Sequence, residues 1–296
     1  MRDSPSVEAA WRSHRPYLVN LAYQMLGDVG EAEDVAQDAF LRLARTDLAQ
    51  IDDIRGWLTV VAGRLCLDQV RSARVRREQP EENGILEASR PVNQSPNPDP
   101  AERVTLDDEI RDALFEVLRR LSPGERVAFV LHDVFQIPFE EIAQTVGRPI
   151  GTCRQLARRA RAKFQGAAPP VTDVSRVEHR QVIDKFIAAC ADGDLQALTE
   201  VLDPAVWGMG TILGDPVAPP QINHGPQEVA TNLLRYLGHG ATVVSGPVGQ
   251  PVLLAFTNRR LFAVLVLTLR DNLIVKIEAT ADPSAPGRTA GQPDPS

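Results

Sequence analysis

The feature that most constrains this chain is a proline-rich stretch, residues 79–104, which carries five prolines. Proline lacks a backbone N–H and clashes with the preceding helical turn, so this stretch is predicted to be a flexible linker. A second break is predicted at residues 166–170, and the Pro- and Gly-rich residues 283–296 are predicted to be a disordered tail. The chain is therefore predicted to fold as three domains: residues 1–78, 105–168 and 171–282.

The first two domains show helical periodicity. Leu18, Leu21 and Met25 lie at helical spacing, and a later helix is expected to begin near Asp53. In the second domain, the Ser-Pro-Gly-Glu sequence of residues 122–125 has the form of a capping box with proline in the first turn. Both are therefore predicted to be all-α domains.

The pattern changes after residue 170. Apolar residues at helical spacing predict helices over 182–190 and 229–237, and Asp194 is expected to cap a short helix between them. Runs of β-forming residues predict strands over 251–256, 261–269 and 273–278, with a hairpin turn at 270–272. In the last strand Leu273, Val275 and Ile277 are expected to point inward. Helices followed by an antiparallel sheet predict an α+β domain.

The net charge of −7 at first argues against a polyanionic partner. Counted by segment, the acidic excess lies in residues 79–104 and 169–296, whereas residues 1–78 and 105–168 carry −1 and +1. The charge therefore does not exclude nucleic-acid binding by the helical domains. It also suggests that the acidic C-terminal domain competes with DNA for basic helices.

The two helices predicted between residues 139 and 164 favour DNA binding. They are joined by a turn at Gly147 and follow the helix-turn-helix plan. Between Arg148 and Lys163 there are six cations and no acid, a composition suited to phosphates and base edges; a solvated surface helix is the alternative. The candidate DNA-binding residues are Thr152, Arg154, Gln155, Arg158, Arg159 and Arg161.

A second basic cluster runs from Arg64 to Arg77, with five arginines against Asp68 alone. It continues a helix whose other face holds Trp57 and Leu65. A basic helix end beside an aromatic residue can hold a DNA backbone and stack on separated bases. The same cations also suit the helix dipole, so both interpretations stay open.

Three regions together resemble a known family. Residues 31–43, 57–68 and 121–161 are similar, in that order, to the characteristic regions of bacterial extracytoplasmic-function (ECF) sigma factors. Residues 176–282 are similar in length and element order to the SnoaL-like (NTF2-like) domain of the long-tailed members. The resemblance implies a sigma-2 domain (1–78) and a sigma-4 domain (105–168), both all-α, followed by a cone-shaped α+β domain.

The same resemblance implies a function and its residues. The chain would direct transcription initiation by bringing the RNA polymerase core, through its β′ and β subunits, to promoter DNA. The residues implied to bind the clamp helices of β′ are Asp34, Gln37, Asp38 and Phe40. Those implied to read and open the −10 element are Trp57, Arg64, Asp68, Arg71 and Arg74, and the helix over 152–163 would read the −35 element. Val60, Gly63 and Arg64 depart from the family pattern, so no −10 sequence is predicted.

The C-terminal domain is predicted to regulate rather than catalyse, by contacting the sigma domains of the same chain and changing their exposure. The candidate acids and bases are Asp184, Asp192, Asp203, Asp215 and His224, but no pair has motif spacing. No metal or cofactor is predicted, because the three cysteines are far apart and form no ligand pattern.

The sequence also predicts a cytoplasmic protein without membrane contact, since it lacks a signal-peptide core and any apolar run of about 18 residues. Two other functions stay open: a one-component helix-turn-helix regulator that senses a small molecule in the C-terminal pocket, and a SnoaL-type enzyme with a DNA-binding half. A pocket lined only by apolar side chains would exclude the enzyme.

Overall fold

The computed structural model describes residues 7–78, 120–164, 173–213, 219–238, 240–246 and 252–282. The predicted linker and tail, the second break, residues 105–119 of the second predicted domain and the candidate Asp215 lie outside these residues.

The first helical domain contains α1 (Val7–Leu26), α2 (Val29–Leu43), the 3-10 helix η1 (Leu48–Gln50) and α3 (Ile54–Glu78). Gly27 ends α1 with a φ of 80°, which other residues rarely adopt. Asp28 then caps α2, because its carboxylate accepts a hydrogen bond from the N–H of Glu31 at 2.9 Å. The predicted apolar stripe of α1 is buried, so the helical prediction is confirmed.

The second helical domain contains α5 (Pro123–Phe129), the π-helix η2 (Val130–Val134), α6 (Phe139–Val146) and α7 (Ile150–Phe164). The predicted capping box is present: Ser122 and Glu125 exchange hydrogen bonds between side chain and backbone. Gly147, with a φ of 66°, makes the turn between α6 and α7. The predicted helix-turn-helix is therefore confirmed.

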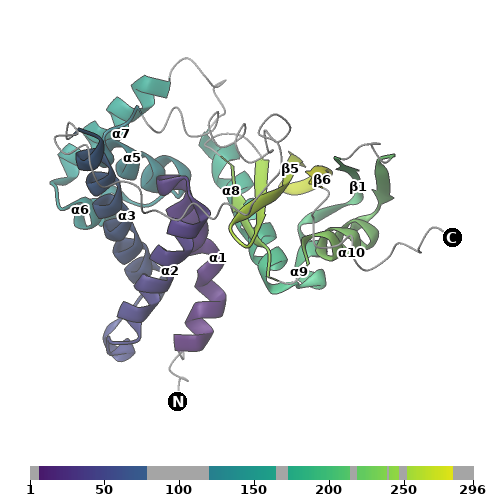
Figure 1. The fold of residues 1–296 in the computed structure, drawn as a ribbon, viewed down its shortest axis with the longest axis horizontal. Helices are drawn as coiled ribbons and strands as arrows, with labels where there is room; N and C mark the ends of the chain where they lie inside the picture. The colour runs from purple at the N-terminus through teal and green to yellow at the C-terminus, as the bar shows by residue number, and fades with distance from the viewer. Residues whose placement is uncertain are drawn as a thin grey trace, which may run out of the picture.

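The third domain combines α8 (Asp173–Asp192), α9 (Leu195–Glu200) and α10 (Pro226–Leu237) with one sheet. The strands are β1 (Leu202–Ile212), β2 (Gln221–His224), β3 (Thr242–Ser245), β4 (Val252–Thr257), β5 (Arg260–Arg270) and β6 (Leu273–Ala281), in the order β2-β1-β6-β5-β4-β3. Asp194 caps α9 as predicted. Figure 1 shows the helices α1 to α7 on one side of the molecule and the sheet on the other, with α8 between them.

Two expectations about the sheet were wrong. It is not wholly antiparallel, because β1 pairs with β6 in parallel. In β6, Ile277 is buried as expected, but Leu273 and Val275 are only half-buried, and Ile274 and Ala281 are buried as well. The reason is a bulge: Leu269 pairs with Ile274 and Thr268 with Lys276, so Val275 is the extra residue and the alternation of faces shifts there.

The β3–β4 end of the sheet is buried on both faces. Leu253 and Ala255 of β4 belong to the core of the α+β domain, whereas Leu254 and Phe256 join the core of the helical domains. Because successive side chains of a strand point to opposite faces, β4 lies between two cores. The core of the helical domains therefore continues onto the back of the sheet.

Candidate functional site

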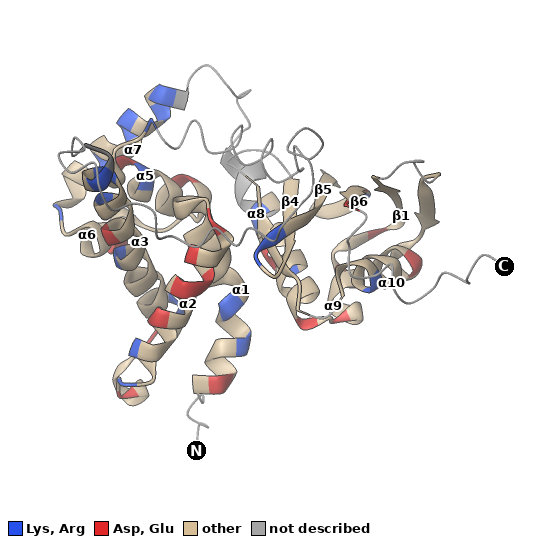
Figure 2. Cartoon of the chain, viewed as in Figure 1, with Lys and Arg blue, Asp and Glu red and all other residues tan. Residues whose placement is uncertain are grey.

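The outer surface of α7 carries the basic residues expected to meet DNA. Cys153, Ala157 and Ala160 are fully buried and fix which face of α7 points inward. Arg154, Gln155, Arg158, Arg159 and Arg161 are exposed, and Thr152 is half-buried. Figure 2 shows the cations gathered along this helix. The structure thus brings all six predicted side chains of this group to one helix, mostly at the surface.

Two cations of α7 also have a structural role. The Nε of Arg161 lies 2.6 Å from Oδ1 of Asp133, and Nζ of Lys163 lies 2.7 Å from Oε2 of Glu125. Burial raises the pKa of the Glu125 carboxyl, but hydrogen bonds from Lys163 and Ser122 outweigh it and hold the pKa below its usual value. Arg161 and Lys163 therefore tie α7 to η2 and α5.

The second predicted surface, on α3, faces the other helical domain in part. Arg64, Asp68, Arg71 and Arg74 are exposed and Trp57 is half-buried. The Nη2 of Arg64 donates a hydrogen bond of 3.0 Å to the carbonyl oxygen of Gln144 in α6. A Cβ placed on Gly63 would lie only 2.6 Å from Cγ2 of Thr145. The glycine thus permits close packing of α3 on α6, and the two helical domains lie against each other.

The acidic helix α2 exposes three of its four predicted residues: Asp34, Gln37 and Asp38. Phe40 is buried and packs edge-on against Trp11, with ring centroids 4.7 Å apart. In this arrangement Phe40 is a core residue of the first domain and lies beneath the surface of α2.

The α+β domain contacts this acidic helix through a basic residue. Nη2 of Arg259, in the turn between β4 and β5, lies 2.8 Å from Oδ1 of Asp34. Nearby, the hydroxyl of Thr242 in β3 donates a hydrogen bond of 2.7 Å to Glu33. Within the described residues, these contacts lie on α2, and none that joins the acidic domain to the basic helix α7 is seen, unlike the arrangement that the charge distribution suggested.

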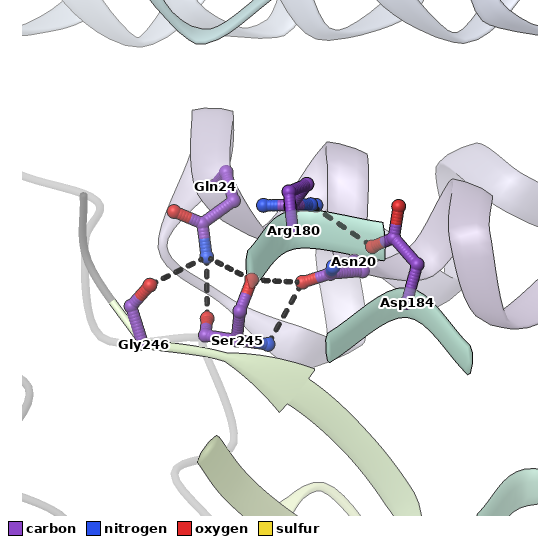
Figure 3. A network of polar contacts seen from close by, with 6 residues as sticks. All are labelled: Asn20, Gln24, Arg180, Asp184, Ser245 and Gly246. Atoms are coloured by element: carbon purple, nitrogen blue, oxygen red, sulfur yellow. Dashed lines mark hydrogen bonds and ion pairs between the residues drawn. The ribbon is translucent and has the colours of Figure 1, made fainter. Parts of the chain in front are cut away.

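A buried polar network joins α1 to the β3 end of the sheet (Figure 3). Oδ1 of Asn20 accepts hydrogen bonds from both the backbone N–H and the hydroxyl of Ser245, each 2.9 Å long. Nε2 of Gln24 donates to the carbonyl oxygens of Ser245 and Gly246. Asn20, Gln24 and Ser245 are all buried, so this network is a fixed part of the contact.

All three domains meet at a stack of side chains. The guanidinium of Arg180 in α8 lies 4.1 Å from the ring centroid of Phe135, which follows η2. Phe135 packs edge-on against Tyr17 of α1 at 5.5 Å, and Arg55 of α3 lies 4.0 Å from the Tyr17 ring. Burial raises the pKa of the Tyr17 hydroxyl above its usual value. The stack connects α8 to both helical domains.

The α+β domain also contains a cavity of about 110 Å³ between its sheet and α10. None of the described catalytic candidates lines it. Asp184 is ion-paired with Arg180 at 2.9 Å, Asp203 accepts a hydrogen bond from the N–H of Ala205, and Asp192 and His224 are exposed. The cavity therefore has a binding shape without a catalytic acid or base from this set.

The residues of the domain contact that escaped the sequence analysis include Asn20, Gln24, Ser245 and Arg259. One available signal lies in α1, where the predicted stripe accounts for only one face. Val19 and Tyr23 flank Asn20 and Gln24 and form a second apolar face, and every residue from Leu18 to Met25 is buried. A helix that is apolar on two faces is one that a second body covers.

Within the described residues, no group of three or more His, Cys, Asp or Glu side chains is placed to hold a metal ion. The three cysteines are unpaired thiols, and burial raises the pKa values of Cys66 and Cys190. No helix in the part of the chain that the structure describes is long and apolar enough to span a bilayer.

Comparison with known proteins shows which family the chain resembles. Residues 10–76 match the model of Sigma-70 region 2, and residues 111–164 match that of Sigma-70, region 4. The chain is 47% identical to the probable ECF RNA polymerase sigma factor SigI of Mycobacterium tuberculosis, over 96% of each chain. The ECF sigma factor SigJ of the same organism is 39% identical over 66% of this chain and 62% of its own.

Two solved structures are also similar. The crystal structure of M. tuberculosis SigJ covers 93% of this chain and 96% of its own, at 29% identity and a TM-score of 0.36. An NTF-2 like protein from Burkholderia xenovorans covers 40% of this chain and 97% of its own, at 17% identity and a TM-score of 0.28. The alignment with SigI, at 96% of each chain, includes both the helical domains and the α+β domain. The chain therefore belongs to the family of ECF RNA polymerase sigma factors.

Proposed function

We propose that this chain is a promoter-specific initiation factor whose α+β domain restrains it until polymerase or promoter DNA displaces that domain. In this proposal, α2 binds the clamp helices of the polymerase β′ subunit, α3 binds the −10 element and α7 binds the −35 element. The observation that carries the restraint is the ion pair between Arg259 and Asp34, since Asp34 is a residue proposed to contact polymerase.

The packing of the helical domains against each other also supports a restrained, inactive arrangement. Elements named −10 and −35 are about 25 base pairs apart, which at 3.4 Å per pair is about 85 Å of duplex. With Gly63 packed on Thr145 and Arg64 bonded to Gln144, α3 and α6 are in direct contact. The two DNA-binding surfaces would have to separate to reach both elements, so the described arrangement is the inactive one.

The stack at Phe135 gives the α+β domain a way to hold this closed arrangement. Arg180 reaches Phe135 of the second helical domain, while Asn20 and Gln24 of the first domain bind β3 and the residue after it. One rigid domain that contacts both helical domains reduces the freedom of each to move apart. Release of the α+β domain would then favour the open arrangement.

Arg259→Ala in the full chain tests the proposal, with the neighbouring exposed Arg260→Ala as a matched control. We expect Arg259→Ala to bind core polymerase several-fold more tightly and to raise run-off transcription from a cognate promoter. An exposed pair contributes at most about 1 kcal/mol, which corresponds to roughly fivefold. Arg260→Ala should behave like the unmodified chain.

Two results would contradict the proposal. Equal polymerase affinity of the Arg259→Ala and Arg260→Ala chains would show that Arg259 does not restrain polymerase binding. If none of the three chains gave a promoter-dependent transcript, the proposed role in initiation would be contradicted. Replacing both Asp34 and Asp38 with Arg distinguishes the one-component regulator, which would keep DNA binding and never require polymerase.

A further inference from the structure

The cavity of the α+β domain is a small-molecule site by its shape. It lies between β1, β5, β6 and α10 and has a volume of about 110 Å³. An apolar protein cavity of about 150 Å³ holds benzene, so a single ring is the largest apolar body expected in this somewhat smaller cavity. Apolar walls come from Val229, Leu233, Leu237, Phe262, Leu265 and Ile277.

The polar side chains of the cavity are all neutral: three amides, one phenol and the hydroxyl of Thr211. The hydroxyl of Tyr236 donates a hydrogen bond of 2.6 Å to Oε1 of Gln221, and Nδ2 of Asn232 donates one of 2.5 Å to Oδ1 of Asn223. Both acceptor oxygens are thus engaged, which leaves the amide N–H groups of Gln221 and Asn223 to donate. Among the described lining residues there is no Asp, Glu, His, Lys or Arg.

Two glycines of β1 make room for an occupant. A Cβ on Gly208 would lie 3.5 Å from the methyl groups of Val229 in α10, so this face of β1 points toward α10. Gly210, two residues on, faces the same way because strand residues alternate. A Cβ on Gly210 would have no neighbour within 4 Å. The space beside Gly210 is therefore an open part of the cavity.

We propose that this cavity binds a neutral organic molecule with a ring-sized apolar body and a carbonyl or hydroxyl group that accepts from the amides of Gln221 and Asn223. An ionic ligand is disfavoured, because a charge taken out of water needs an opposite charge or many hydrogen bonds to offset its desolvation. The site binds without catalysis, since the described lining offers no carboxylate or imidazole to act as a base. Binding does not depend on the proposed restraint.

The test uses the full chain and three probes of equal ring size, followed by ¹⁹F NMR. We expect 4-fluorobenzyl alcohol to bind saturably, with a Kd near about 1 mM, as suits nine non-hydrogen atoms. The matched anion 4-fluorobenzoate and the matched cation 4-fluorobenzylamine should bind at least about tenfold more weakly. Absence of saturable binding of the alcohol up to about 10 mM, or equal binding of an ionic probe, would overturn the proposal.

Two substitutions locate the binding. Gly210→Leu should weaken binding of the alcohol at least about tenfold, because the leucine side chain would occupy the space that the ring needs. Val266→Leu is the control, because Val266 is exposed on β5 and does not line the cavity. If the leucine variant unfolds, Gly210→Ala replaces it in the test: its single added methyl group should also weaken binding of the alcohol. Unchanged affinity of a folded Gly210→Leu chain, judged by thermal unfolding, would place the probe elsewhere.

Discussion

At the scale of single residues, exposure does not by itself define the DNA-binding set on α7. Arg158 and Arg161 are both exposed and both follow the sequence pattern. Arg161 is nevertheless bound to Asp133, whose side chain is only 10% exposed, whereas Arg158 has no ion pair within the described residues. The two arginines should therefore differ in what their loss costs.

We expect Arg161→Ala to lower the free energy of unfolding by about 2 kcal/mol, because the carboxylate of Asp133 loses its charged partner in a largely buried place. Arg158→Ala should change stability by less than about 0.5 kcal/mol. Arg158→Ala should weaken promoter binding. It should also make the negative slope of the logarithm of the binding constant against the logarithm of salt concentration shallower by about one. Urea unfolding and salt-dependent DNA binding measure both effects. A stable Arg161→Ala chain with the reduced salt slope would instead assign Arg161 to DNA.

At the scale of helices and strands, the sequence predicted those elements whose residues repeat with one period. The stripes of α1, α8 and α10 and the long apolar runs of β4, β5 and β6 were confirmed. α8 begins nine residues before the predicted range, and the bounds of α10 and of the three strands shift by up to three residues. β1, β2 and β3 were missed, because two glycines interrupt β1 and the other two have four residues each. The bulge at Val275 was also beyond prediction, since it depends on pairing between strands.

The same limit applies to the candidate site. The helix-turn-helix residues could be chosen from charge and spacing on one element. The contact of Arg259 with Asp34 could not, because it joins residues 225 positions apart through the placement of a whole domain.

The contact between α3 and α6 gives a prediction at this scale. In Gly63→Ala, the added methyl group meets Cγ2 of Thr145, and a buried β-branched side chain has little freedom to turn aside. The helices should move apart and the radius of gyration, measured by small-angle X-ray scattering, should increase. Thr145→Ser removes that methyl group and keeps the hydroxyl that bonds Glu141, so it should restore the compact form in the double variant. An unchanged radius in Gly63→Ala would show that the contact adjusts.

At the scale of the whole molecule, the position of the α+β domain depends on a neutral buried network more than on surface charge. Gln24 is 2% exposed and donates to two carbonyl oxygens. By contrast, the side chains of Arg259 and Asp34 are each 57% exposed, so salt screens their pair. High salt should therefore weaken the restraint on α2 without releasing the domain.

Gln24→Glu should release it. The substitution places a carboxylate against two carbonyl oxygens in a buried site, which costs about 3 kcal/mol or more. We expect a larger hydrodynamic radius with unchanged helix content in circular dichroism. Gln196→Glu, at an exposed position of α9, makes the same chemical change as a control. A compact Gln24→Glu chain at neutral pH would mean that other contacts hold the domain in place.

The burial of β4 on both faces has a consequence for the order of folding during synthesis. The face of α1 that packs against β3 and β4 is complete once Leu26 has been made, but its cover is complete only after Thr257. At about 5 to 20 residues per second, the interval is about 10 to 50 s. During synthesis Tyr23 and the amides of Asn20 and Gln24 are therefore without their final neighbours for that interval, and a chaperone or a polymerase can reach them first.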